Sequence, residues 1–224
     1  MVKKQEVVIA KKRGPKPKGK VDIKWSPNFA YAIGLIATDG CLYNNGRHIS
    51  LTSLDVEQLV NFNKALNIKV KISTKKGIND KLCTHIQFSD VLFYQFLISI
   101  GITPAKSKTI GVIKFPKKYF FDFLRGCFDG DGSFYSYYDK RWKSSFMFYL
   151  TFASASVEFI KWIRSELKEK IGVEGHISSA KNYSTLQLRY AKKESMEIIK
   201  KMYYNNKVLY LSRKRKKIEK ALKI

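Results

Sequence analysis

Two apolar segments with helical character stand out along the chain, one near its start and one near its middle. The first, NFAYAIGLIATDG, spans residues 28–40, and Ser26 and Pro27 before it are typical of a helix N-cap and first turn. The second, KKYFFDFLRGCFDGDG, spans residues 117–132 and follows Pro116. Both end in Asp and Gly, a common helix stop, so the pattern predicts two helices of similar design.

The segments after each helix repeat the same order of hydrophobic patterns. Alternating polar and apolar residues predict two short strands, a run with helical spacing follows, and two further strands and a helix complete the unit. In the first half the strands are predicted at 41–45, 47–53, 68–74 and 82–89 and the helices at 55–66 and 90–101. In the second half the strands are predicted at 133–139, 144–154, 173–180 and 185–191 and the helices at 156–172 and 193–203. The chain is therefore predicted to be a tandem duplication.

Matched positions in the two halves set the expected domain boundaries. SLDVEQ at 53–58 matches SASVEF at 154–159, and the offset grows from 92 residues at the apolar helices to 101 here, which indicates a longer hairpin in the second half. We expect a first repeat at residues 25–113 and a second at 114–224. Residues 1–24 are basic and broken by Gly and Pro, so we expect an extended arm that is disordered when free. Such an arm is typical either of minor-groove binding or of a plain solvated tail.

Alternation within the strands predicts that each half forms an antiparallel sheet with one face on helices and the other face free. The expected fold class is α/β (α+β), with two pseudo-symmetric αββαββα repeats forming a saddle around a central two-helix interface. The expected free faces carry charged, amide and aromatic residues: Arg47, Lys69, Lys71, Gln87, Tyr135, Tyr137, Arg141, Lys181, Gln187 and Arg189. Because Arg reads guanine and Gln reads adenine in the major groove, this set contains the candidate DNA contacts.

The charge of the chain favours a polyanionic partner. The 224 residues contain 43 Lys and Arg against 18 Asp and Glu, and the resulting net charge of +25 opposes compaction. Nucleic acid fits this excess better than an anionic membrane surface, which calls for a basic amphipathic helix with a broad apolar face. The alternative is a solubilising surface with no particular partner.

Cysteine and hydropathy patterns argue against several other classes. Three cysteines without a CxxC pair and only three histidines do not fit a disulfide scaffold or a zinc site. No segment approaches the roughly 18 consecutive apolar residues of a spanning helix, and no apolar stretch of a secretory signal follows the basic N-terminus. We expect an intracellular protein, in the cytoplasm or nucleoid or in a eukaryotic organelle, with no membrane partner.

The two apolar helices contain a repeated nine-residue segment, AIGLIATDG at 32–40 and LRGCFDGDG at 124–132. Both resemble the LAGLIDADG motif, and the resemblance extends over the chain from Trp25 onward, in the two-repeat order of monomeric LAGLIDADG homing endonucleases. The resemblance implies a monomer that makes a staggered double-strand break in a long asymmetric site of double-stranded DNA. It also implies metal-assisted phosphodiester hydrolysis and a role in intron homing.

The glycines and aspartates of the repeated segment also have a physical explanation. Gly34 and Gly126 lack side chains, which allows two helices to cross closely and brings Asp39 and Asp131 together at one end. Helix C-termini carry partial negative charge, so two acids there favour a bound cation, and hard oxygen ligands favour Mg²⁺. We expect Mn²⁺ to support activity too. Asp129 has no acidic match in the first copy, so we expect a helix-terminal hydrogen bond there rather than a required metal ligand.

The family resemblance places further candidates near the two acids. Ser53 and Ser154 hold the place where family members often put a polar residue close to metal-bound water, and the alternative is that they cap the helices that follow. Lys106 in ITPAKSKT and Lys214 in LSRKRKK are the candidate central cations, with phosphate contact as the alternative role. Their basic neighbours are Lys108 and Arg213.

Two other functions remain open for a chain of this pattern. One is an RNA maturase, which would use a basic saddle to hold structured intron RNA and assist group I intron splicing. The other is a DNA-binding regulator that has lost cleavage. The presence of both Asp39 and Asp131 favours the enzyme over these alternatives.

Overall fold

The computed structural model describes residues 19–76, 82–142, 144–179 and 185–223. Within these ranges no helix is long and apolar enough to cross a membrane. Most of the expected basic arm and the expected DNA contact Lys181 lie outside the described residues.

The first repeat follows the predicted αββαββα order. Its elements are α1 (Pro27–Asp39), β1 (Gly40–Leu42), β2 (His48–Ser53), α2 (Val56–Leu66), β3 (Ser73–Lys76), β4 (Leu82–Ser89) and α3 (Val91–Ser99). The strands form an antiparallel sheet in the order β1-β2-β4-β3. A short 3₁₀ turn at Lys106–Lys108 lies on the path from α3 to the second repeat.

The second repeat has the same order and one additional helix. Its elements are α4 (Phe120–Asp131), β5 (Ser133–Tyr138), β6 (Phe146–Ser154), α5 (Val157–Ile171), β7 (His176–Ser179), β8 (Leu186–Tyr190), α6 (Lys192–Met202) and α7 (Ser212–Leu222). The sheet order β5-β6-β8-β7 repeats that of the first sheet. The predicted α/β duplication is therefore confirmed, whereas α7 was not predicted from the sequence.

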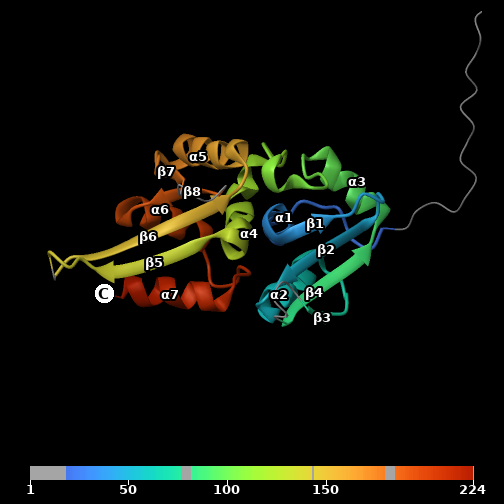
Figure 1. The fold of residues 1–224 in the computed structure, drawn as a ribbon, viewed down its shortest axis with the longest axis horizontal. Coiled ribbons are helices and arrows are strands. Elements are labelled where there is room, and N and C mark those ends of the chain that lie inside the picture. Colours follow the sequence, from blue (N-terminus) through green and yellow to red (C-terminus); the bar gives the residue numbers. More distant parts are fainter. Residues whose placement is uncertain (1–18, 77–81, 143, 180–184, 224) are drawn as a thin grey trace, which may run out of the picture.

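The two sheets lie on either side of the central helices α1 and α4 (Figure 1). In each sheet, alternate residues of the strands are buried against helices, as Ile49 and Leu51 are in β2 and Phe148 and Leu150 are in β6. The longer hairpin of the second half is also present, because β5 and β6 are both longer than β1 and are joined by residues 139–145.

Glycines set the distance between α1 and α4. A Cβ atom on Gly34 would lie 2.2 Å from the carbonyl oxygen of Phe123, and one on Gly126 would lie 2.1 Å from that of Tyr31. No real side chain tolerates such distances, so the two backbones touch where the motif glycines face each other. The close helix crossing expected from the sequence is present.

The N-terminal boundary of the folded body differs from the expected one. Val21 is buried, and its backbone N–H donates to the Asp90 side chain at 3.0 Å. Asp90 is also the N-cap of α3, where it accepts from the N–H of Phe93. Residues 20–24 are therefore attached to the folded body rather than being part of a free arm, and Ser26 caps α1 as predicted.

Candidate active site and DNA-facing surfaces

Asp39 and Asp131 are the last residues of α1 and α4, and the crossing of these helices brings them to the same end. Each is followed by a glycine in extended conformation, at which a Cβ atom would collide with the preceding helical turn. Burial and the charge of Asp131 raise the pKa of Asp39 to about 6. Burial also raises the pKa of Asp131. The two carboxyl groups are therefore close enough to repel each other in a poorly solvated site.

Two buried lysines cap the ends of these helices. The Lys106 ammonium donates to the carbonyl oxygens of Gly40 and Thr38. The Lys214 ammonium donates to four carbonyl oxygens at the end of α4, those of Phe128 at 2.6 Å, Asp129 at 2.8 Å, Gly130 at 2.9 Å and Gly132 at 2.7 Å. Each lysine thus supplies a cation where a helix exposes unpaired carbonyls and partial negative charge.

The lysines and the acids form one electrostatic cluster. Burial lowers the pKa of Lys106, and burial lowers the pKa of Lys214 to about 8, while the charges of both aspartates act in the opposite direction. In turn, both lysines lower the pKa values of Asp39 and Asp131. The structure therefore brings together the two acids and the two cations that the sequence singled out separately.

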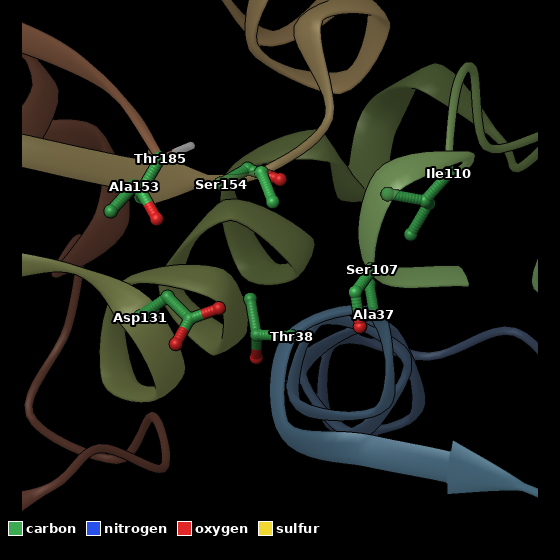
Figure 2. A pocket seen from close by; sticks show the side chains of 9 residues that line it. Ala37, Thr38, Ser107, Ile110, Asp131, Ala153, Ser154 and Thr185 are labelled. Atoms are coloured by element: carbon green, nitrogen blue, oxygen red, sulfur yellow. The ribbon is translucent and has the colours of Figure 1, made fainter. Parts of the chain in front are cut away.

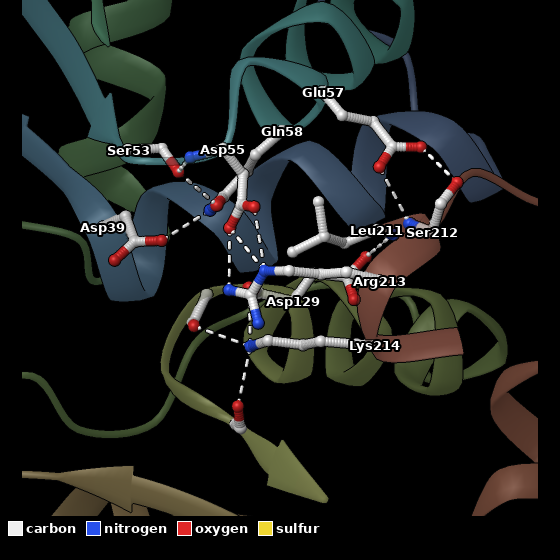
Figure 3. Close-up of polar contacts among 12 residues, drawn as sticks. Asp39, Ser53, Asp55, Glu57, Gln58, Asp129, Leu211, Ser212, Arg213 and Lys214 are labelled. Atoms are coloured by element: carbon white, nitrogen blue, oxygen red, sulfur yellow. Dashed lines mark hydrogen bonds and ion pairs between the residues drawn. The ribbon is translucent and has the colours of Figure 1, made fainter. Parts of the chain in front are cut away.

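The two acids have different surroundings. Gln58, from the first turn of α2, donates its amide N–H to Oδ2 of Asp39 at 2.5 Å, and its carbonyl oxygen accepts from the Ser53 hydroxyl at 2.8 Å (Figure 3). The matching residue of the second repeat is Phe159, which is buried in the core. Gln58 was not among the predicted site residues, although the unlike pair of Gln58 and Phe159 at the end of SLDVEQ and SASVEF is visible in the sequence.

Asp131 instead borders a small cavity of about 230 Å³. Thr38, Ser107 and Ser154 contribute polar side chains to its lining (Figure 2). Ser154 thus lies on the Asp131 side, whereas Ser53 reaches Asp39 only through Gln58.

The alternative role of the two serines as helix N-caps is wrong. The N-caps of α2 and α5 are Asp55 and Ser156, two residues further along. Ser53 and Ser154 accept hydrogen bonds from the backbone N–H groups of those N-cap residues, at 3.0 and 3.1 Å. Each serine hydroxyl thus forms a local hydrogen bond to the backbone two residues on, and this bond shapes the turn between strand and helix.

Asp129 links three helices from a fully buried position. Its Oδ2 accepts from the Tyr31 hydroxyl of α1 at 2.7 Å and from the backbone N–H of Leu211, just before α7, at 2.8 Å. Burial raises its pKa to about 6. These bonds hold the segment that carries Lys214 against the end of α4.

Comparisons with known proteins agree with this geometry at the level of the fold. No family model matches the chain, and no curated protein matches its sequence. Among solved structures, the N-terminal LAGLIDADG domain of DUF199/WhiA is 20% identical, with a TM-score of 0.55 and 88% of each chain covered. The meganuclease I-SmaMI, bound to uncleavable DNA, is 14% identical, with a TM-score of 0.57 over 87% of this chain and 90% of that one. I-DmoI, in complex with DNA and Mn, is 16% identical, with a TM-score of 0.52 over 80% of this chain and 98% of that one.

This chain has the two-repeat LAGLIDADG fold. The paired acids at the ends of its LAGLIDADG helices have a donor set that suits a divalent cation. Within the described ranges no three His, Cys, Asp or Glu side chains gather into a complete metal site. Mg²⁺ commonly binds through one or two carboxylates and completes its shell with substrate phosphates and water. A cation shared by Asp39 and Asp131 would also relieve the repulsion between them.

The free face of the second LAGLIDADG sheet carries a row of tyrosines. Tyr135, Tyr137 and Tyr149 stack side by side, with ring centroids 5.5 and 6.3 Å apart. The Arg189 guanidinium lies over the Tyr149 ring and donates to the Gln187 side chain at 3.0 Å. These five residues line a hollow of about 520 Å³. The predicted face residues of β5 and β8 are thus on one surface.

The first LAGLIDADG sheet presents a different face. Its register places Cys41, Ser50, Thr52, His85 and Gln87 on the side opposite the buried Ile49 and Leu51. Gln87 is exposed there as predicted, and it accepts weakly from the Tyr43 hydroxyl at 3.4 Å. Lys75 of β3, opposite Cys83, is an exposed charge on the same face, which has no row of tyrosines, so the two half-surfaces differ.

Four of the basic residues predicted as DNA contacts lie outside the strands of the two sheets. Arg47 is in the turn between β1 and β2, and Arg141 is in the β5–β6 hairpin, where it pairs with Asp139 at 3.5 Å. Lys69 and Lys71 precede β3, because the Asn63 side chain bonds both backbone groups of Val70 in place of a neighbouring strand. All four are exposed and lie outside the strands, so their place on the sheet faces is not confirmed, and their contact with DNA stays a prediction.

Proposed function

We propose that this protein is a site-specific DNA endonuclease that uses a divalent cation, Mg²⁺ in the first place, to hydrolyse both strands of a duplex. The observation that carries the proposal is the pair Asp39 and Asp131, which lie at one end of two crossed helices and interact in a poorly solvated site between two sheets. The similar structures of I-SmaMI with DNA and of I-DmoI with DNA and Mn support this choice of ligands.

The residues of the site have distinct roles in this proposal. Asp39 and Asp131 would hold the cation, which polarises a scissile phosphate and lowers the pKa of water when it is bound. Lys106 and Lys214 are held by main-chain carbonyls, so they act as fixed positive charges near the phosphates rather than as mobile proton carriers. Gln58 orients Asp39, and Ser154 and Thr38 offer hydrogen bonds beside Asp131.

The two sheet faces support an asymmetric target. One half-surface offers tyrosines, Arg189 and Gln187, and the other offers small polar side chains, Gln87 and Lys75. Because base edges are read by the side chains that reach them, unlike faces select unlike half-sites. One chain supplies both acids, so a monomer suffices for a staggered double-strand break.

The test begins with selection of bound duplexes from a random library in Ca²⁺, followed by incubation of the selected site with Mg²⁺ or Mn²⁺. We expect cleavage of both strands near the centre of the site. Asp39→Asn and Asp131→Asn should lose double-strand cleavage and keep binding, because phosphate and base contacts are made elsewhere. The exposed Asp22→Asn is the matched control and should cut normally. Unchanged cutting by either active-site variant would refute the assignment.

A second candidate is a DNA-binding protein without cleavage activity. The specific observation in its favour is that a domain of DUF199/WhiA, whose description names no nuclease activity, is similar in fold to this chain. Selective binding of a duplex with no cleavage in Mg²⁺ or Mn²⁺ would favour this candidate. The maturase alternative is tested separately, by adding the protein to a self-splicing group I intron and measuring the splicing rate.

A further inference from the structure

The helix α7 has no counterpart in the first repeat. After α3, the chain passes through two 3₁₀ turns, at Lys106–Lys108 and Lys117–Tyr119, and forms no further α-helix before α4. After α6, in contrast, it forms the 11-residue helix SRKRKKIEKAL. Besides Lys214, which belongs to the site already described, α7 carries further basic residues whose role the paired acids do not explain.

The start of α7 is fixed to both repeats. Arg213 forms an ion pair with Asp55, the N-cap of α2, at 2.7 Å, and the backbone N–H of Ser212 donates to Glu57 at 2.9 Å (Figure 3). Lys214, Ile218 and Ala221 are buried, and their spacing defines the inner side of the helix. The opposite side is therefore held in one orientation.

That outer side carries a stripe of lysines. At helical spacing opposite Ile218 lie Lys216 and Lys220 of the helix and Lys223, its C-cap. Lys217 flanks them, and all four lysines are exposed. The one acid of α7, Glu219, is paired with Arg215 at 2.8 Å on another side. Among the residues that the structure describes, these four lysines form no ion pair with a carboxylate. We call them the α7 stripe.

The α7 stripe lies next to the candidate DNA-facing surface. In Figure 1, α7 runs beside β5, the edge strand of the second sheet. Lys217 and Lys220 line a hollow of about 440 Å³ around the β5 edge. Its lining includes Tyr135 and Tyr137 of the tyrosine row, and Phe134, Ser136 and Tyr138 from the other face of β5. The stripe therefore continues the margin of the tyrosine face.

We propose that the α7 stripe binds consecutive phosphates of one DNA strand along the β5 edge, so that backbone contacts extend further over the second half-site than over the first. This inference rests on the proposed function insofar as the partner is duplex DNA. The stripe spans about 10 Å along the helix axis, at 1.5 Å per residue. Along the axis of duplex DNA, one strand advances about 3.4 Å per phosphate, so a stripe parallel to that axis matches about three phosphates.

The test measures the salt dependence of binding to a selected duplex in Ca²⁺, where no cleavage interferes. Lys216→Gln, Lys217→Gln and Lys220→Gln are combined in one variant. Each lost phosphate contact reduces the slope of log affinity against log salt by about 0.9, so we expect a slope less steep by about 2 to 3. The matched control removes the same charge from α6, with Lys193→Gln, Lys200→Gln and Lys201→Gln, because α6 packs on the buried side of the sheet.

Phosphate ethylation interference gives a second readout. The wild type should show a run of about three interfering phosphates on one half-site, matching the length of the stripe, and the α7 variant should lose it. Equal slope changes in both triple variants would show a general charge effect and overturn the proposal, as would an unchanged slope in the α7 variant. Wild-type cleavage in Mg²⁺ is scored on the same duplex. Binding without cleavage would refute the nuclease while leaving the comparison of the triple variants decisive for α7.

Discussion

Asp39 destabilises the fold that positions it. Its pKa is raised to about 6, above the roughly 3.9 of an ordinary Asp side chain, so the folded state binds more protons than the unfolded state between about pH 4 and 6. The contribution of Asp39 to stability is therefore greatest at low pH and is lost as the pH rises through this window. At pH 8 the residue is ionised in a site that opposes ionisation.

Asp39→Asn should therefore stabilise the protein at pH 8 in the absence of metal. We expect a gain on the order of 1–2 kcal/mol in the free energy of unfolding, because the desolvated charge and its repulsion from Asp131 are removed. Urea unfolding at pH 8 and at pH 4 measures it, and the gain should vanish at pH 4. A loss of stability at pH 8, or a similar gain in Asp22→Asn, would contradict this account.

The same titration should act on metal affinity with the opposite sign. A cation competes with protons for the carboxylates, so the apparent affinity for Mn²⁺ should fall about tenfold per pH unit as the pH drops below about 6. Electron paramagnetic resonance of free Mn²⁺ measures this directly, without DNA. If the apparent affinity for Mn²⁺ is the same at pH 7 and at pH 5, the aspartates are not the ligands.

At the scale of elements, the contact between α1 and α4 depends on the absence of two methyl groups. Gly34→Ala would place a Cβ atom 2.2 Å from the Phe123 carbonyl, so the helices must separate. We expect destabilisation of roughly 1–3 kcal/mol or more. Gly111→Ala is the control, since its nearest neighbouring atom is 4.0 Å away and its backbone accepts a side chain. Differential scanning calorimetry of both variants tests this prediction, and equal melting temperatures would contradict it.

The elements that could be predicted from the sequence are those with strong local patterns. The motif helices and the strand at 82–89 agree closely with α1, α4 and β4, because apolar periodicity and caps specify them. The helix α7 was not predicted because only Ile218, Ala221 and Leu222 of its residues are apolar, and tertiary contacts with α2 and β5 stabilise it. The segment at 68–72 was predicted as a strand from its alternation alone.

The site was predictable only in part, for a similar reason. Asp39 and Asp131 could be found because they occur twice in a matched pattern. Gln58 could not be assigned in this way, since its position depends on how α2 packs beside the end of α1. The faces assigned to the basic residues depended on where each strand was predicted to begin and end. An error of one or two residues in a strand end moves a side chain off the face of the sheet.

At the scale of the whole molecule, the two repeats behave as one packed unit. Phe115, between the repeats, lies 5.9 Å from Trp25 of the first and 6.0 Å from Trp162 of the second, measured between ring centroids. Further bonds across the interface join Tyr31 to Asp129 and, as an ion pair, Asp55 to Arg213. These contacts leave neither repeat independent of the other.

We therefore expect a single cooperative unfolding transition. Two variants, each with one reporter tryptophan, separate the signals: Trp142→Phe combined with Trp162→Phe reports on Trp25, and Trp142→Phe combined with Trp25→Phe reports on Trp162. The urea dependence of both fluorescence signals should coincide with that of circular dichroism after correction for the stability of each variant. Two separated transitions in the protein with all three tryptophans would show that the repeats unfold independently.

The unequal neighbours of the two acids have a consequence for the order of events on DNA. Asp39 is already held by an amide when substrate arrives, whereas its partner faces a cavity that must first fill. If the protein is a nuclease, its two strand scissions will have different rate constants, and a transient nicked duplex will always be broken on the same strand. A different label on each strand, followed through a single turnover, would show which strand is cut first. The fixed order would be disproved if both full-length strands disappeared at the same rate.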